Sequence, residues 1–276
     1  MLNIPYFQRK VTVVITHELS NYLGTQLTID RVDLGLFNHV ILENVNLKDR
    51  QGHPLLKASR LSASFDLLPF LTQQKVSLRS VQLYNFRIAL TKANSKAPLN
   101  AQFLIDAFKS KKPKKESHLD LRVNSLLVRH GNVSYDLLSD PYLLPDELAK
   151  RRLNVHHLNI SELQASISLK QLTNDSIYAS VKRFSFKEQS GFELKRLRLK
   201  VHANSHQASV EDFELQLPNT SLHFAPLKAR YESFKAFKNI ADSVHWQCEL
   251  LPSEVQLSDL GALVPALHGI DSPFSL

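Results

Sequence analysis

Glycine is scarce in this chain, with 7 among 276 residues, where average usage of roughly 7% would give about nineteen. No two glycines lie closer together than eight positions. Backbone loops that cradle phosphate need closely spaced glycines, because the loop must approach its ligand without a Cβ. The sequence therefore excludes a dinucleotide-binding glycine loop, a P-loop and the glycine-flanked serine of α/β-hydrolases.

Cysteine is almost absent, since Cys248 is the single one. An internal disulfide and a metal site with several cysteine ligands are both excluded. Cys248 has Trp246 and Glu249 nearby and no Lys or Arg that would lower the pKa of its thiol. We therefore expect a half-buried strand residue at this position rather than a nucleophile.

Long apolar runs are also missing, because no stretch approaches the ~20 apolar residues that a bilayer-spanning helix needs. The 34 basic and 26 acidic residues give a net charge of +8, and a diffuse excess of this kind is typical of solubility. The basic run from Lys109 to Lys115 has no interleaved aromatic residues and contains Pro113, so it indicates a solvated linker. Nucleic acid is therefore not an expected partner.

The pattern of apolar residues changes once along the chain. Residues 4–23 carry apolar side chains every three to four positions, which predicts an amphipathic helix that stops at Gly24. From Leu27 onward apolar and polar residues alternate, as in strands with one covered face. We therefore expect an N-terminal helix over 1–24, a first β segment over 25–109, a charged linker over 110–117 and a second β segment over 118–276.

The alternation repeatedly skips one residue within a row, as between Leu42 and Val45 or between Val210 and Phe213. In a flat strand such a slip would move the rest of the row to the other face. A β-bulge restores the face and bends the strand, and bulges at similar places in neighbouring strands would curl the sheet. A two-residue turn between short strands is the alternative at each skip.

The apolar rows exceed what the few predicted helices can cover. The sheet either folds onto a second sheet as a closed sandwich, or remains an open trough that holds apolar material other than protein. The predicted fold class is mainly β: a curled, bulged antiparallel sheet that forms an elongated open groove, with an N-terminal amphipathic helix and a few short helices.

The polar residues do not assemble into a recognisable reaction centre. His156 and His157 are adjacent and would point to opposite faces of a strand, while His202 and His206 flank a predicted turn and fit polar hairpin positions. Asp136 and Asp140 lie in a proline-containing loop region, where capping and solvation explain carboxylates. We expect no catalytic residues, no metal and no cofactor, and a hydrolase is the weakest reading because no nucleophile–base spacing is visible.

Four stretches together carry a family likeness. They are Ile4-Pro-Tyr-Phe-Gln8 with Leu27-Thr-Ile-Asp-Arg-Val32, the hairpin pattern from Val40 to Leu61, Val128-Arg-His-Gly-Asn-Val-Ser-Tyr135, and Phe186-Lys-Glu-Gln-Ser-Gly-Phe192. In this order they resemble the AsmA-like superfamily and, within it, the TamB-like translocation and assembly module proteins of the Bacteroidetes type. The likeness runs in patches over most of the chain.

Membership would imply a bacterial cell-envelope protein on the periplasmic side, anchored to the inner membrane by a helix that this chain lacks just before Leu2. It would also imply a β-rich groove with an apolar interior for lipid transport between the inner and outer membranes, and a role in outer-membrane protein assembly. An outer-membrane barrel partner would bind through C-terminal regions that are missing here. The chain is therefore expected to be an N-terminal fragment.

The first functional hypothesis is a non-enzymatic segment whose apolar groove takes phospholipid acyl chains. The residues predicted to line that groove are Val32, Leu34, Val40, Leu42, Val45, Leu47, Leu78, Val81, Leu83, Phe86, Phe184, Phe186, Leu197, Leu199, Phe213 and Leu215. The alternative is a β-sandwich adhesion or scaffold module that binds protein partners through loops or an edge strand.

Overall fold

The computed structural model describes residues 4–35, 39–65, 76–109, 119–120, 124–141, 152–172, 176–234, 236, 243–267, 270 and 273–275. The chain divides into two compact units. Unit 1 comprises Met1–Leu144 and Asn154–Glu162, and unit 2 comprises Pro145–Leu153 and Leu163–Leu276. The predicted linker over 110–117 lies outside the described residues.

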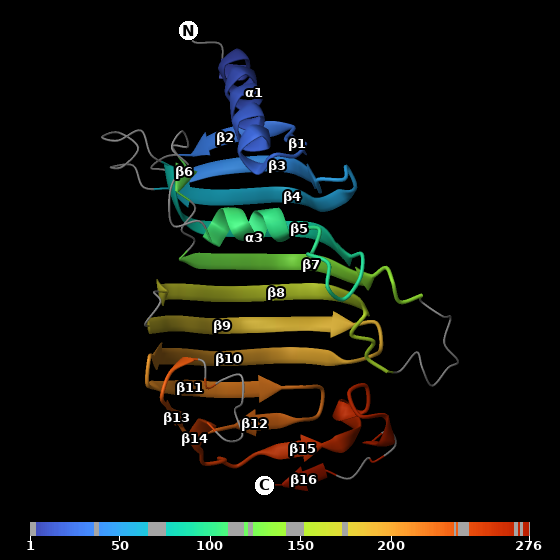
Figure 1. The fold of residues 1–276 in the computed structure, drawn as a ribbon, viewed down its shortest axis with the longest axis vertical. Helices are drawn as coiled ribbons and strands as arrows, with labels where there is room; N and C mark the ends of the chain where they lie inside the picture. Colours follow the sequence, from blue (N-terminus) through green and yellow to red (C-terminus); the bar gives the residue numbers. More distant parts are fainter. Residues whose placement is uncertain are drawn as a thin grey trace. The chain divides into compact units, whose positions relative to one another are not determined.

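The described part of unit 1 is a β-sheet accompanied by helices (Figure 1). Its elements are α1 (Ile4–Leu23), β1 (Leu27–Thr28), β2 (Arg31–Gly35), β3 (His39–Lys48), β4 (Pro54–Phe65), β5 (Val76–Lys92), α3 (Gln102–Lys109), β6 (Leu119–Asp120) and β7 (Ser125–Leu137). The strand order is β1-β3-β4-β5-β7, with β2 also on β3 and β6 also on β5. β8 (His157–Leu172) begins in unit 1 and ends in unit 2.

Unit 2 is also mainly β. Its further elements are β9 (Ser176–Glu188), β10 (Glu193–Asn204), β11 (Gln207–Gln216), β12 (Ser221–His223), β13 (Leu227–Tyr231), β14 (Val244–Gln247), β15 (Glu254–Gln256), β16 (Pro273–Ser275) and the 3₁₀ helices η3 (Leu257–Leu260) and η4 (Pro265–Leu267). β9 through β12 pair in sequence, and β13 pairs with β11 and β14. A small core forms where Ala229, Tyr231 and Val244 pack together.

The predicted fold class is confirmed: the chain is mainly β with a bulged, largely antiparallel sheet, an N-terminal helix and few other helices. One departure is that β5 pairs with β7 and β6 in parallel. Parallel neighbours need a long crossover connection, and the segment that contains α3 carries the chain back between β5 and β7. Among the described residues, no helix is both long and apolar enough to cross a membrane.

Helix α1 protects the edge of the unit 1 sheet at β1 and β2, beside which it lies in Figure 1. Thr12 Oγ1 accepts a hydrogen bond from the Val32 backbone N–H at 3.1 Å. Ser20 Oγ accepts from the Leu27 N–H at 3.2 Å and donates to the Leu27 carbonyl at 3.4 Å. Unpaired backbone groups on an edge strand invite pairing with another chain, and the two hydroxyls give partners to three such groups, the N–H and carbonyl of Leu27 and the N–H of Val32.

A row of interrupted pairs crosses four strands of unit 1. The β3–β4 ladder passes over Asn44 and Ser59 between its Glu43–Arg60 and Val45–Ala58 pairs. The ladders from β4 to β5 and from β5 to β7 then pass over Asn85 and His130 in the same way. We call Asn44, Ser59, Asn85 and His130 the kink row.

Left-handed backbone at the kink row explains the skipped alternation in unit 1. Asn44, Asn85 and His130 have φ values of 52°, 46° and 54°, a region in which Asn and His are enriched among non-glycine residues. In a regular strand, the apolar residue that follows each kink would point to the opposite face of the sheet. The kink adds one residue, so this apolar side chain stays on the same face as the apolar residues before it. Leu42 and Val45, which are three positions apart, are therefore both buried.

In unit 2 the skips coincide with β-bulges, and Asp212, just before Phe213, is also left-handed, with φ 52°. Leu194 pairs with Phe186 and Leu197 with Phe184, so two residues of β10 lie opposite one of β9. The register shifts again before Leu199, and once more between β10 and β11. The shift between β10 and β11 falls within the predicted skip from Val210 to Phe213. Ile29 and Val32 are also three positions apart, and they span the break between β1 and β2.

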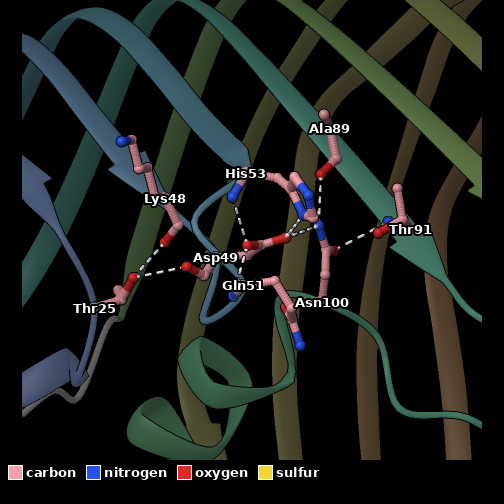
Figure 2. Close-up of polar contacts among 8 residues, drawn as sticks. All are labelled: Thr25, Lys48, Asp49, Gln51, His53, Ala89, Thr91 and Asn100. Atoms are coloured by element: carbon pink, nitrogen blue, oxygen red, sulfur yellow. Dashed lines mark hydrogen bonds and ion pairs between the residues drawn. The ribbon is translucent and has the colours of Figure 1, made fainter.

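A buried carboxylate holds the β3–β4 hairpin of unit 1 (Figure 2). Asp49, only 2% exposed, accepts hydrogen bonds at Oδ1 from the N–H groups of Gln51 at 2.9 Å and His53 at 2.8 Å. Its Oδ2 accepts from Asn100 Nδ2 at 3.4 Å, and the Asn100 side chain also donates to the Ala89 carbonyl on β5 at 3.1 Å. These contacts attach the segment that leads into α3 to both the hairpin and β5.

Candidate functional site

The predicted lining residues of unit 1 whose side chains the structure describes lie on one face of the sheet as cross-strand neighbours. One row of neighbours is Val32, Leu42, Leu61, Leu83 and Val128, on β2, β3, β4, β5 and β7. A second row is Val45, Ala58, Phe86 and Gly131. A third is Val40, Ala63, Val81 and Leu126, with the backbone of Leu34 paired to that of Val40. We call the face that these rows share the apolar face of unit 1.

Burial differs along the apolar face of unit 1. Val32, Leu42, Val45, Leu47, Leu83 and Phe86 are buried, with exposed fractions from 1% to 8%. Val40 and Val81 are half-buried. The side chains of Leu34 and Leu78 lie outside the described residues, although the backbone of Leu78 pairs with Phe65. Leu61 and Val128 belong to the same rows, which their place in the alternation already indicated.

In unit 2 the predicted residues also face one another across strands. Leu197 on β10 lies directly opposite Phe184 on β9 and Leu215 on β11, and Leu199 lies opposite Val181. The rings of Phe184 and Phe186 are 5.6 Å apart edge to face, and those of Phe213 and Phe224 are 5.2 Å apart. We call this surface the apolar face of unit 2.

The apolar face of unit 2 is less covered than that of unit 1. All six residues predicted to line it, Phe184, Phe186, Leu197, Leu199, Phe213 and Leu215, are half-buried. Within the described parts of β8 to β11, the buried apolar residues are Ala165 and Leu194. Apolar side chains beneath a packed protein layer are normally buried. The partial exposure of these six therefore indicates that they contact neighbouring side chains of the same sheet face and are not covered by a packed layer.

The opposite face of the unit 2 sheet is charged. Arg198 and Lys200 both contact Asp212 Oδ2, at 3.4 Å and 2.8 Å, and Arg196 lies 3.5 Å from Glu214. The hydrogen bond between Lys200 and Asp212 raises the pKa of Lys200 and lowers that of Asp212. Successive strand residues point to opposite faces, so the sheet separates a hydrated face from an apolar one.

The acidic and histidine residues considered as reaction groups have structural partners. His157 Nδ1 contacts Asp136 Oδ1 at 3.0 Å, and the hydrogen bond to Asp136 raises the pKa of His157. His156 contacts Asp140, so each of the two carboxylates contacts a histidine. Asp136 lies within β7 rather than in the predicted loop. His206 Nδ1 contacts the Glu232 carbonyl at 3.0 Å.

The ring of His202 lies 4.0 Å from that of Tyr178. In the described part of the chain, no group of three or more His, Cys, Asp or Glu side chains is arranged to hold a metal ion. Cys248 is exposed rather than half-buried. It follows the last residue of β14 and so has no strand neighbour on either side.

Compared with models of protein families and with curated protein sequences, the chain matches none. The resemblance to the AsmA-like superfamily therefore stays a prediction from sequence motifs. The functional argument rests on the apolar faces themselves.

Proposed function

We propose that this chain is a non-enzymatic segment of a large bacterial cell-envelope protein, on the periplasmic side, that shields phospholipid acyl chains on the apolar faces of its sheet during transport between membranes. The observation that carries the proposal is the half-exposed apolar face of unit 2, where six predicted lining residues remain partly open. A face of this kind is stable in water when hydrocarbon covers it.

In the proposed mechanism the apolar surface solvates the acyl chain without holding it at one tightly binding position. Each acyl CH₂ transferred from water to an apolar surface gains ~0.8 kcal/mol. Neighbouring strands repeat every ~4.8 Å, and the rows of aliphatic and aromatic side chains in unit 2 recur at that spacing from β9 through β11. A chain that moves by one strand therefore exchanges one set of apolar contacts for a similar set, so the barrier to movement stays low.

The test compares two variants with the same charge change on opposite faces. Leu199→Asp places a carboxylate on the apolar face of unit 2, and Gln216→Asp places one on the charged face, beside Arg196. The wild-type chain and the Gln216→Asp chain should carry phospholipid through purification, and Leu199→Asp should lose most of it, as measured by mass spectrometry of organic extracts.

Circular dichroism would show that both variants keep their strand content, because Leu199 is already half-exposed. Equal amounts of bound phospholipid in the two variants, or none in the wild type after exposure to phospholipid vesicles, would reject the proposal. Binding of a protein through loops with no lipid bound would favour the scaffold alternative.

A further inference from the structure

A polar depression lies on the face of the unit 1 sheet opposite its apolar face. Its volume is about 570 Å³, within the roughly 300–1,000 Å³ range of small-molecule sites. The lining residues are Asn44, Val45, Asn46, Lys57, Ala58, Ser59, Asn85, Phe86, Arg87, His130 and Asn132. Val45, Ala58 and Phe86 are buried with their side chains on the apolar face, so the polar residues form the accessible walls.

Two rows of cross-strand neighbours build the depression. The first is the kink row, which spans β3, β4, β5 and β7. The second consists of Asn46, Lys57, Arg87 and Asn132, which are direct partners across the same four strands. Asn44, Asn85 and His130 of the kink row have left-handed backbone, whereas the residues of the second row do not.

The charge in the depression is unbalanced. Lys57 and Arg87 lie directly opposite each other on β4 and β5 and are both exposed. Like charges at opposed positions destabilise a sheet. Within the described part of the chain neither cation forms an ion pair, and the lining contains no Asp or Glu.

The remaining walls supply hydrogen-bond donors. Asn46 and Asn132 end the row that holds the two cations, and Asn44, Asn85, Ser59 and His130 occupy the kink row. Side-chain amides and a hydroxyl donate hydrogen bonds, and Arg and Lys are the side chains that recognise phosphate. A dianion placed between Lys57 and Arg87 would remove their mutual repulsion.

We propose that this depression binds a phosphate group, held between Lys57 and Arg87 and hydrogen-bonded by the asparagine side chains around them. Two opposed cations match the two negative charges of a phosphomonoester. The site lies on the face opposite the apolar face of unit 1. The phosphate proposal is therefore independent of the proposed lipid function, and it would stand if no lipid binding were found.

The first experiment measures binding of inorganic phosphate to the full chain by calorimetry at low ionic strength, with chloride at equal ionic strength as the reference. Lys57→Gln or Arg87→Gln should weaken binding by about tenfold or more, since each removes a charge-assisted contact. Lys96→Gln, an exposed cation outside the depression, should leave binding unchanged. Asn85→Gly keeps left-handed backbone accessible and tests the amide alone.

Two sources of the phosphate are distinguished by a second arm with phosphatidic acid vesicles and pure phosphatidylcholine vesicles. Phosphatidic acid binding that inorganic phosphate displaces and that Arg87→Gln weakens would support a lipid head group. Phosphate binding with no vesicle binding would support a soluble phosphate compound. No binding beyond that in chloride, or equal losses in Lys57→Gln and Lys96→Gln, would overturn the site.

Discussion

The ring of Phe86 on β5 occupies the space above Gly131 on β7. A Cβ added at Gly131 would lie 2.1 Å from Phe86 Cζ and 2.4 Å from Cε1. The two residues are direct partners in the parallel β5–β7 ladder, and Phe86 is only 3% exposed. The glycine therefore allows a large ring to lie across the neighbouring strand, within the row that also contains Val45 and Ala58.

The first prediction concerns this contact. Gly131→Ala should lower the free energy of unfolding by about 1–3 kcal/mol, because the new methyl group overlaps the ring and overpacks a buried site. Phe86→Leu combined with Gly131→Ala should recover part of the loss, since the smaller side chain leaves room for the methyl group. Urea unfolding of the single and double variants measures the coupling; strictly additive effects would contradict the contact.

The kink row provides the second prediction. Asn85 has φ 46°, and left-handed backbone costs most residues roughly 1–2 kcal/mol but is tolerated by Gly and Asn. Asn85→Val should therefore destabilise unit 1 by at least that amount, whereas Asn85→Gly should be close to neutral. The matched control is Arg87→Val, two residues along the same strand in regular β conformation. Similar losses for Asn85→Val and Arg87→Val would show that the kink is not required.

The sequence indicates where the strands are interrupted, but it does not indicate the backbone conformation at those positions. The three-residue spacings between Leu42 and Val45 and between Leu83 and Phe86 indicate an interruption in each strand. An asparagine stands just before the second apolar residue in both cases, at Asn44 and Asn85. The spacing alone does not distinguish a bulge from left-handed backbone, because both add one residue before the face is restored.

Other features depend on contacts distant in the sequence. The parallel pairing of β5 with β7 follows from the crossover that contains α3, and strand alternation carries no sign of direction. The contact between Asn100 and Asp49 joins residues 51 positions apart, and no local pattern indicates it. The apolar rows were predictable because apolar residues at every second position of a strand point to the same face of the sheet.

The third prediction concerns the buried Asp49. Asp49→Ala leaves the N–H groups of Gln51 and His53 without the acceptor that they use at 2.9 Å and 2.8 Å. We expect a loss of about 1–3 kcal/mol in the free energy of unfolding and faster amide exchange in the hairpin. Asp49→Asn keeps one acceptor oxygen and should lose less. Equal losses in the two variants would show that the side-chain acceptor has no special role.

The last prediction is a pH dependence at the β7–β8 connection. The hydrogen bond to Asp136 raises the pKa of His157 above its ordinary value near 6.5. A raised pKa in the folded state means that the stabilisation is fully present below the unfolded value and is lost as pH rises through the folded value. The free energy of unfolding should therefore fall as pH rises above about 6.5, the ordinary histidine value, by less than about 1 kcal/mol because Asp136 is 48% exposed and solvent screens the pair. Asp136→Asn should flatten this slope and lower the His157 pKa measured by NMR titration, and an unchanged titration in that variant would refute the assignment.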